Sequence, residues 1–227
     1  MTLVFLPGFM CDARLFGPQL AAFPDSLVVT TTTKDTMTGM ANDVLAHAPD
    51  KFALAGLSMG GIVAMEIMRL APGRVTRLAL LDTNHRAETA DIKAARMPLI
   101  EAVQSGNLGG VLRDQVIPQY LTDDQENHAI SDFCVAMGQD LGAAAFVNQS
   151  RALMDRCDQT ETLKAIDCPA LILCGAQDRL CPVARHQDMA RLIPQATLKI
   201  IEHAGHLPTL EEPAATTAAL NRWLQAS

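Results

Sequence analysis

The sequence KFALAGLSMGG, residues 51–61, decides the fold of this chain. An apolar, strand-like run precedes Ser58, and an apolar, helix-like run follows it as far as Leu70. A turn that joins the two so sharply forces the serine into a strained backbone conformation, and Gly56 and Gly60 let the flanking segments pass closely. The stretch therefore predicts a strand, a tight turn and a helix, with the hydroxyl of Ser58 lifted clear of the strand end.

A glycine-rich turn between a strand and a helix can also hold phosphate. Phosphate sites of that kind carry G-x-x-x-x-G-K-[ST] or G-x-G-x-x-G, and the sequence has neither pattern and no lysine near the start of the helix. The bare G-x-S-x-G pattern occurs by chance in roughly one chain in fifteen of this size. Its position between a strand and a helix is what gives it weight.

The composition and charge of the chain limit the kinds of molecule that it is expected to bind. The chain has 227 residues, 49% of them hydrophobic, which is enough for one sizeable core and one domain with an insertion. Its formal charge is -7, from 25 acidic and 18 basic residues with no run of Lys or Arg, which argues against nucleic acid or a membrane as partner. A small, neutral or weakly charged molecule fits this balance better, and the oligomeric state is left open.

Residues 1–10 are apolar but lack a basic n-region and a small-residue cleavage site, so they do not resemble a signal peptide. No apolar stretch approaches the length of a membrane span. The cysteines have no C-x-x-C spacing and several lie in apolar segments, so we expect reduced thiols, neither disulfides nor metal ligands: Cys11, Cys134, Cys157, Cys168, Cys174 and Cys181. Together these features predict a cytoplasmic protein.

Strand-like and helix-like segments alternate along most of the chain. The predicted strands are 2–6, 27–32, 52–55, 75–81, 170–174 and 197–201, and the predicted helices are 14–23, 37–46, 62–70, 183–192 and 213–224. Nearly continuous apolar strands in this alternation predict an α/β fold. Its sheet is expected to be mostly parallel, with helices on both faces and ligands beyond the carboxyl ends of the strands.

Residues 84–160 interrupt that alternation. They are rich in Ala, Met and Gln, show no clear strand, and are broken by loop signals at 105–107 and 122–124. We expect a helical cap here, inserted into a core of residues 1–83 and 161–227. Five apolar cap residues suit either a pocket wall or the cap's own core: Met97, Ile100, Phe133, Met137 and Phe146.

A serine hydroxyl is a weak nucleophile until a base takes its proton, and an acid must hold that base in the right tautomer. Residues 202–208, EHAGHLP, follow the last predicted strand, and residues 175–179, GAQDR, follow the strand before it. These loops place an aspartate and then a histidine after the serine, in the chain order expected for such a turn.

With these segments the chain resembles the α/β-hydrolase superfamily, in particular its small, cofactor-free, helical-capped serine hydrolases. That group includes carboxylesterases, enol-lactonases and pimeloyl-acyl-carrier methyl ester esterases. The resemblance covers essentially the full length and rests on the G-x-S-x-G turn, the acid loop 175–182 and the ending G-H-x-x-x-x-E-x-P at 205–213. It implies an α/β-hydrolase fold of about six strands, with Ser58 as nucleophile, Asp178 as orienting acid, His206 as general base, and no metal or organic cofactor.

Two of these roles have a rival. His203 lies in the same loop as His206, but His206 follows a glycine and precedes a proline-started helix, as in the family. Asp82 ends the fourth predicted strand, where some relatives place their acid, although an aspartate there can equally cap a turn. On these motif grounds we favour His206 and Asp178.

Stabilising the negative charge of a tetrahedral intermediate takes backbone N–H donors, each worth on the order of 3 kcal/mol. One is expected from Met59, directly after the serine. The other is expected from Phe9, in the loop after the first strand. Pro7 stands where many relatives have a histidine that braces this loop, so the bracing of the loop is left open.

The resemblance implies a serine hydrolase that cleaves a small ester, thioester or lactone through an acyl-enzyme on Ser58. Because fold does not fix chemistry, the alternatives are a cofactor-free perhydrolase, a carbon-carbon hydrolase or lyase, and a ligand-binding receptor. The natural acyl and alcohol parts depend on how the cap folds over the pocket.

Overall fold

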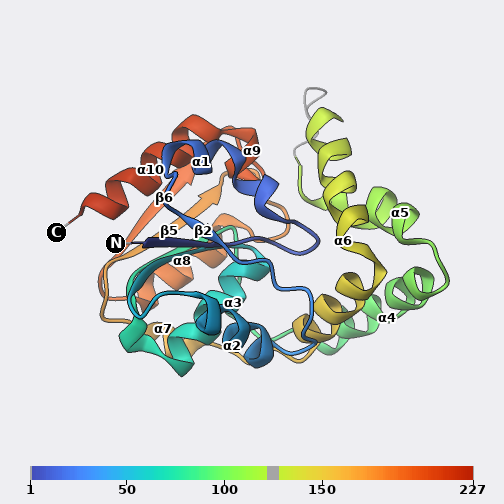
Figure 1. Cartoon of the computed structure of the whole chain (residues 1–227), viewed down its shortest axis with the longest axis horizontal. Helices are drawn as coiled ribbons and strands as arrows, with labels where there is room; N and C mark the ends of the chain where they lie inside the picture. The colour runs from blue at the N-terminus through green and yellow to red at the C-terminus, as the bar shows by residue number, and fades with distance from the viewer. Residues whose placement is uncertain (1, 122–127, 227) are drawn as a thin grey trace.

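The computed structural model describes residues 2–121 and 128–226, and these form one six-stranded sheet (Figure 1). The strand order is β2-β1-β3-β4-β5-β6, and every neighbouring pair is parallel. The strands are β1 (Thr2–Leu6), β2 (Leu27–Val28), β3 (Phe52–Leu57), β4 (Val75–Leu81), β5 (Ala170–Gly175) and β6 (Ala196–Ile201). The α/β fold with about six strands is confirmed.

Helices cover both faces of this sheet, as Figure 1 shows. One face carries α1 and α10, which pack together, and the other carries α2 and α3, with α8 against β5 and β6. Because both faces are covered, β3 and β5 are buried along their whole length, as their unbroken apolar runs require. The helices packed around the sheet are α1 (Gly17–Ala22), α2 (Met37–His47), α3 (Met59–Leu70), α7 (Thr160–Lys164), α8 (Val183–Leu192), α9 (Pro208–Glu211) and α10 (Pro213–Gln225).

Two elements near the N-terminus differ from the prediction. The strand predicted at 27–32 has only two residues, Leu27 and Val28, which pair with Val4 and Phe5 of β1, and β1 itself ends one residue later at Leu6. The helix predicted at 14–23 is a 3-10 turn, Ala13–Phe16, followed by α1. Pro18 lacks the N–H that would continue a hydrogen-bonded helix, but it suits the first turn of a new one.

Three of the helices between β4 and β5 lie beyond the carboxyl ends of the strands (Figure 1). They are α4 (Ala90–Gln104), α5 (Leu108–Val111) and α6 (His128–Met154), with a π turn at Leu112–Val116 and a 3-10 turn at Ile117–Gln119. The break predicted at 105–107 separates α4 from α5. The break predicted at 122–124 lies outside the described residues, and the division at 83/84 and 160/161 stays a prediction.

By length and composition, α6 could cross a membrane, which the sequence analysis did not anticipate. Gly142 interrupts it with φ 83° and ψ 172°, so α6 is two helices joined at a kink. Its apolar side chains Cys134, Met137 and Phe146 are buried within the protein. We therefore describe α6 as a cap helix that packs against its neighbours.

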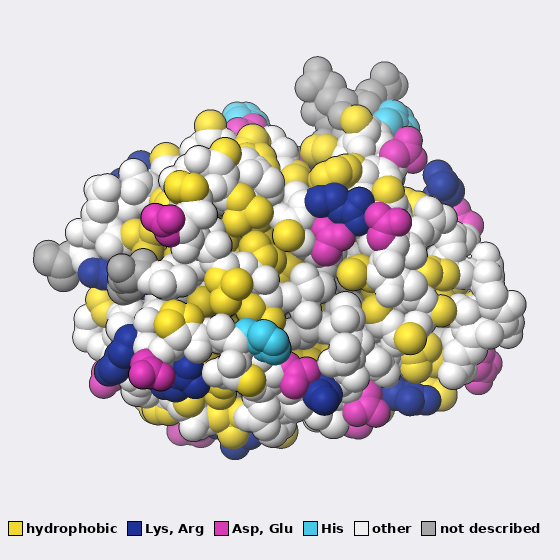
Figure 2. Space-filling model, in the orientation of Figure 1, with side chains coloured by type: hydrophobic (Ala, Val, Ile, Leu, Met, Phe, Trp, Pro, Cys, Tyr) yellow, Lys and Arg dark blue, Asp and Glu magenta, His cyan; other side chains and the backbone are white. Residues whose placement is uncertain are grey.

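The outer surface carries charges of both signs. On the face drawn in Figure 2, acidic and basic side chains are interspersed. Some form exposed ion pairs, such as Lys164 with Glu161 at 2.7 Å. Exposed pairs of this kind contribute only about 0–1 kcal/mol, so the fold depends on its apolar core.

Candidate active site

The turn between β3 and α3 has the strained geometry that the sequence predicts. Ser58 has φ 54° and ψ -116°, a conformation that a residue with a side chain adopts only when its surroundings impose it. A Cβ on Gly60 would overlap the carbonyl of Leu6, and a Cβ on Gly56 would overlap the backbone of Gly60. Both glycines are therefore needed for α3 to start so close to β1 and β3.

Three side chains from three loops form a continuous hydrogen-bonded chain at the carboxyl end of the sheet. His206, after β6, has its Nε2 2.8 Å from Oγ of Ser58. Its Nδ1 lies 2.8 Å from Oδ2 of Asp178, in the loop after β5. The side chains of His206 and Asp178 are buried, so water does not compete for the bond between them. The distances allow a proton to pass from Ser58 to His206.

The carboxyl group of Asp178 is held in its charged form. Its Oδ1 accepts hydrogen bonds from the N–H groups of Leu180 and Cys181 at 2.8 and 2.9 Å. Burial by itself raises the pKa of Asp178, but His206 and the N–H of Cys181 outweigh burial and keep the pKa below its ordinary value of 3.8. A charged Asp178 accepts the Nδ1–H of His206, which leaves Nε2 free to take a proton.

The two rival residues are placed differently. His203 is exposed, whereas His206 is buried. Asp82 is buried with φ 43°, and its Oδ1 accepts a hydrogen bond from the N–H of Gly175 at 2.8 Å. Burial, and then the charge of Asp178, raise the pKa of Asp82 well above its ordinary value. Asp82 is therefore bonded to β5 in surroundings that favour its protonated form, while Asp178 holds the histidine.

Asp178, Cys181 and His206 also bring three possible metal-ligand atoms within 4.8 Å of one another. A metal at this point would have to displace the hydrogen bond between His206 and Asp178. Burial raises the pKa of the Cys181 thiol well above 9.0, so its sulfur keeps its proton. The group therefore fits a hydrogen-bonded triad better than a metal site. All six cysteines lie in the described part of the chain and are free thiols.

The two residues expected to supply the backbone N–H donors share a cavity with the serine. Phe9 and Met59 line the same cavity as Ser58. Among the described residues, neither N–H is bonded to an acceptor. Met59 opens α3, where the first N–H groups have no partner in their own helix. Both donors are therefore available to an oxygen atom of a ligand.

The loop that carries Phe9 is braced by the cap. The hydroxyl of Tyr120 donates to the carbonyl of Phe9 at 3.1 Å, and the N–H of Met10 donates to Oε1 of Gln149 at 2.9 Å. Nε2 of Gln149 in turn donates to the carbonyl of Thr31 at 2.8 Å. The sequence analysis missed both braces, because Tyr120 and Gln149 stand 111 and 139 residues along the chain from their loop partners.

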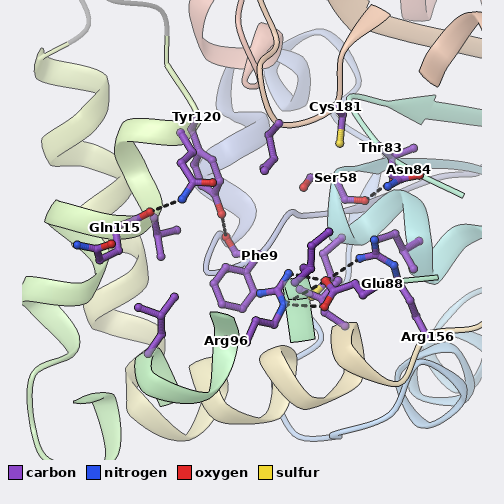
Figure 3. A pocket seen from close by; sticks show the side chains of 18 residues that line it. Phe9, Ser58, Thr83, Asn84, Glu88, Arg96, Gln115, Tyr120, Arg156 and Cys181 are labelled. Atoms are coloured by element: carbon purple, nitrogen blue, oxygen red, sulfur yellow. Dashed lines mark hydrogen bonds and ion pairs between the residues drawn. The ribbon is translucent and has the colours of Figure 1, made fainter. Parts of the chain in front are cut away.

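A cavity of about 200 Å³ includes Ser58 and lies between the sheet and the cap (Figure 3). None of the five apolar cap residues, which the sequence left open between a pocket wall and the cap's own core, lines it. Met97 and Phe133 are exposed, while the other three are buried in the core. Helical spacing indicates an apolar face but not which cavity or core it meets. The apolar cap residues that line the cavity are Ile92, Leu99, Val116 and Leu153.

Residues 3–220 match the model of the alpha/beta hydrolase family. The chain belongs to this family. Among solved α/β-hydrolases, a thermophilic esterase from Thermogutta terrifontis, with malate bound, superposes with a TM-score of 0.90 at 27% identity, over 99% of this chain and 89% of its own.

Curated relatives of this α/β-hydrolase include esterases and an enol-lactonase. The pimeloyl-[acyl-carrier protein] methyl ester esterase of Aliivibrio salmonicida is 26% identical over 82% of this chain and 73% of its own length. The 3-oxoadipate enol-lactonase 1 of Acinetobacter baylyi is 25% identical over 93% of this chain and 84% of its own length. The resemblance read from the motifs is confirmed, and these relatives support hydrolysis of an ester or a lactone.

Proposed function

We propose that this α/β-hydrolase is a serine hydrolase that cleaves a small ester, thioester or lactone through an acyl-enzyme on Ser58. The observation that carries the proposal is the unbroken hydrogen-bond chain from Asp178 through His206 to Ser58. The names of the relatives, esterase and enol-lactonase, support the same class of substrate.

The first half of the reaction forms the acyl-enzyme. His206 takes the proton of Ser58 as Oγ attacks the carbonyl carbon of the substrate. The carbonyl oxygen then carries negative charge, which the N–H groups of Phe9 and Met59 stabilise. The intermediate collapses when His206 gives its proton to the leaving oxygen or sulfur. Asp178 stabilises the protonated histidine during this step.

The second half releases the acid product. His206 takes a proton from water, and the resulting hydroxide attacks the acyl carbonyl carbon on Ser58. The same two N–H groups hold the second oxyanion, and the proton on His206 returns to Oγ as the ester bond to Ser58 breaks. Ser58 and His206 are then in their starting states, so turnover requires no further group.

The test compares hydrolysis of 4-nitrophenyl acetate and butyrate by the parent and by Ser58→Ala. We expect kcat/KM to fall by on the order of 10⁴-fold or more, because the variant lacks the nucleophile. Ser105→Ala, which removes an exposed hydroxyl at the end of α4, serves as the control and keeps the parent rate. Equal rates for the parent and Ser58→Ala would refute the proposal.

Two further readouts separate the alternative functions. Peroxide-dependent halogenation in acetate buffer marks a perhydrolase, because that reaction needs a peracid formed from the buffer. Release of one product molecule for each protein molecule, together with strong thermal stabilisation by the ligand, marks a receptor.

A further inference from the structure

Three charged side chains line the cavity above Ser58, and none of them belongs to the triad. They are Glu88, which precedes α4, Arg96 on α4, and Arg156, which follows α6. Figure 3 shows the three side chains together on one side of the cavity. Two guanidinium groups and one carboxylate leave one positive charge in excess at this wall, in a chain whose formal charge is -7.

The carboxylate of Glu88 already accepts hydrogen bonds from both arginines. Nε of Arg96 lies 3.0 Å from both carboxylate oxygens of Glu88, and its Nη2 lies 2.6 Å from Oε1. Nη1 of Arg156 lies 3.2 Å from the same Oε1. The Glu88 side chain is 1% exposed and that of Arg156 is 9% exposed. A single buried carboxylate therefore faces two cations that have been largely removed from water.

Both arginines keep donors for a further acceptor. Arg156 uses Nε on the carbonyl of Arg86 and Nη1 on Glu88. Among the described residues, no acceptor is bonded to Nη2 of Arg156 or to Nη1 of Arg96. Arg96 is the more accessible of the two, at 24% exposed. A buried cation in excess is costly unless an anion pairs with it, so this wall suits a ligand that brings a negative charge.

The charged wall lies within reach of the proposed reaction centre. The guanidinium carbon of Arg96 lies 5.9 Å from the centroid of the Phe9 ring. Phe9 also carries one of the N–H groups proposed to hold the oxyanion, and both residues line the same cavity of about 200 Å³ as Ser58. A ligand that reaches from Ser58 to Arg96 inside this volume must be short.

We infer that Arg96, supported by Arg156, binds a carboxylate at the far end of the substrate's acyl part, so that the substrate is a monoester of a short dicarboxylic acid. This inference rests on the proposed function. The charge belongs on the acyl part because that part stays on Ser58 after the alcohol has left. The same contact then positions the carbonyl carbon for both attack by Ser58 and attack by water.

The test uses two esters that differ only in charge, monomethyl adipate and its carboxamide analogue methyl adipamate, at pH 7.5. The parent is expected to show a kcat/KM at least about tenfold higher for the anionic ester, since a hydrogen bond between charged groups is lost with the amide. Arg96→Gln brings the ratio to within about twofold, and Arg96→Lys keeps part of the preference because it keeps the charge. Arg113→Gln, an exposed arginine on the cap paired with Asp132, leaves the ratio unchanged.

A parent ratio of one or less, or an unchanged ratio in Arg96→Gln, overturns the inference. Arg96→Lys carries the test if Arg96→Gln does not fold, because Lys retains the charge toward Glu88. A purely structural role of Arg96 would lower the rates of both esters equally and leave the ratio unchanged.

Calorimetric binding of the two esters to Ser58→Ala separates this inference from the proposed function. Preferred binding of monomethyl adipate by Ser58→Ala, with no turnover of either ester by the parent, keeps the carboxylate site at Arg96 but overturns the hydrolase and the ester as its substrate. Turnover of both esters at equal kcat/KM keeps the hydrolase and overturns the inference. If Ser58→Ala binds neither ester and the parent hydrolyses neither, both the inference and the proposed function are overturned.

Discussion

At the scale of single residues, the buried polar groups around the triad are held in different protonation states. The surroundings favour the charged form of Asp178, the protonated form of Asp82 and the neutral form of His186 on α8. Nε2 of His186 accepts the N–H of Thr83 at 3.0 Å, which a protonated ring could not do. Because each pKa differs from its ordinary value, the pH dependence of stability reports on these surroundings.

The first prediction concerns His186. Burial lowers its pKa from 6.5 to about 4, although the charge of Asp178 opposes the shift. The unfolded chain therefore binds a proton that the folded protein does not bind between these two pH values. The histidine's contribution to the free energy of unfolding is full above pH 6.5 and falls by about 3 kcal/mol as the pH drops to 4.

Urea unfolding of the parent and of His186→Gln between pH 7 and pH 4 checks this. The amide oxygen of glutamine can accept the N–H of Thr83 but does not titrate. The difference between the two proteins cancels the opposite contribution of Asp82, whose raised pKa makes stability fall as the pH rises. Parallel stability curves for the two proteins would contradict the account.

At the scale of elements, the site depends on how closely α3 and the cap approach the loop after β1. The glycines of the turn fix the distance of α3 from β1. Tyr120 and Gln149 fix the position of the Phe9 loop from the other side. The geometry around the serine is therefore set jointly by the sheet and by the cap.

A methyl group at position 60 should separate these elements. In Gly60→Ala the new Cβ meets the carbonyl of Leu6, so we expect a loss of about 3 kcal/mol in the free energy of unfolding and a loss of activity. Gly73→Ala is the matched control, because a Cβ there meets nothing within 4 Å, and its stability should change by less than about 0.5 kcal/mol. Similar unfolding curves for the two variants would show that α3 is not packed as described.

The brace from α6 to the Phe9 loop gives a second prediction at this scale. Gln149→Leu leaves the buried N–H of Met10 and the carbonyl of Thr31 without their partner, which costs about 1–3 kcal/mol. Because the loop carries a proposed oxyanion donor, we expect kcat to fall as well, with KM changed less. Gln139→Leu makes the same chemical change at an exposed position of α6 and should alter neither quantity. Equal kcat values for the two variants would remove the loop from the proposed mechanism.

At the scale of the whole molecule, the sequence predicted the sheet and brought out the candidate triad because both depend on local signals. Apolar runs identify β3, β4 and β5, and the loops after β5 and β6 carry Asp178 and His206, which complete the hydrogen-bonded chain to Ser58. The catalytic roles of Ser58, Asp178 and His206 stay predictions, although the structure brings these residues together.

What the sequence could not predict depends on contacts between distant segments. β2 is shorter than its apolar run because only Leu27 and Val28 pair with β1. The cavity wall is set by the rotation of the cap helices, which apolar spacing does not define. The contacts made by Tyr120 and Gln149 join polar residues that belong to no sequence motif. The same holds for the ion pairs around Glu88.

The central claim is that Ser58 is an activated nucleophile, and reaction with a fluorophosphonate probe tests it most directly. The account predicts one adduct for each parent molecule by intact mass, mapped to the peptide that contains Ser58. It also predicts no adduct in Ser58→Ala and slow labelling in His206→Ala, which lacks the base. A folded parent that stays unlabelled, or that is labelled at another residue, would contradict the account.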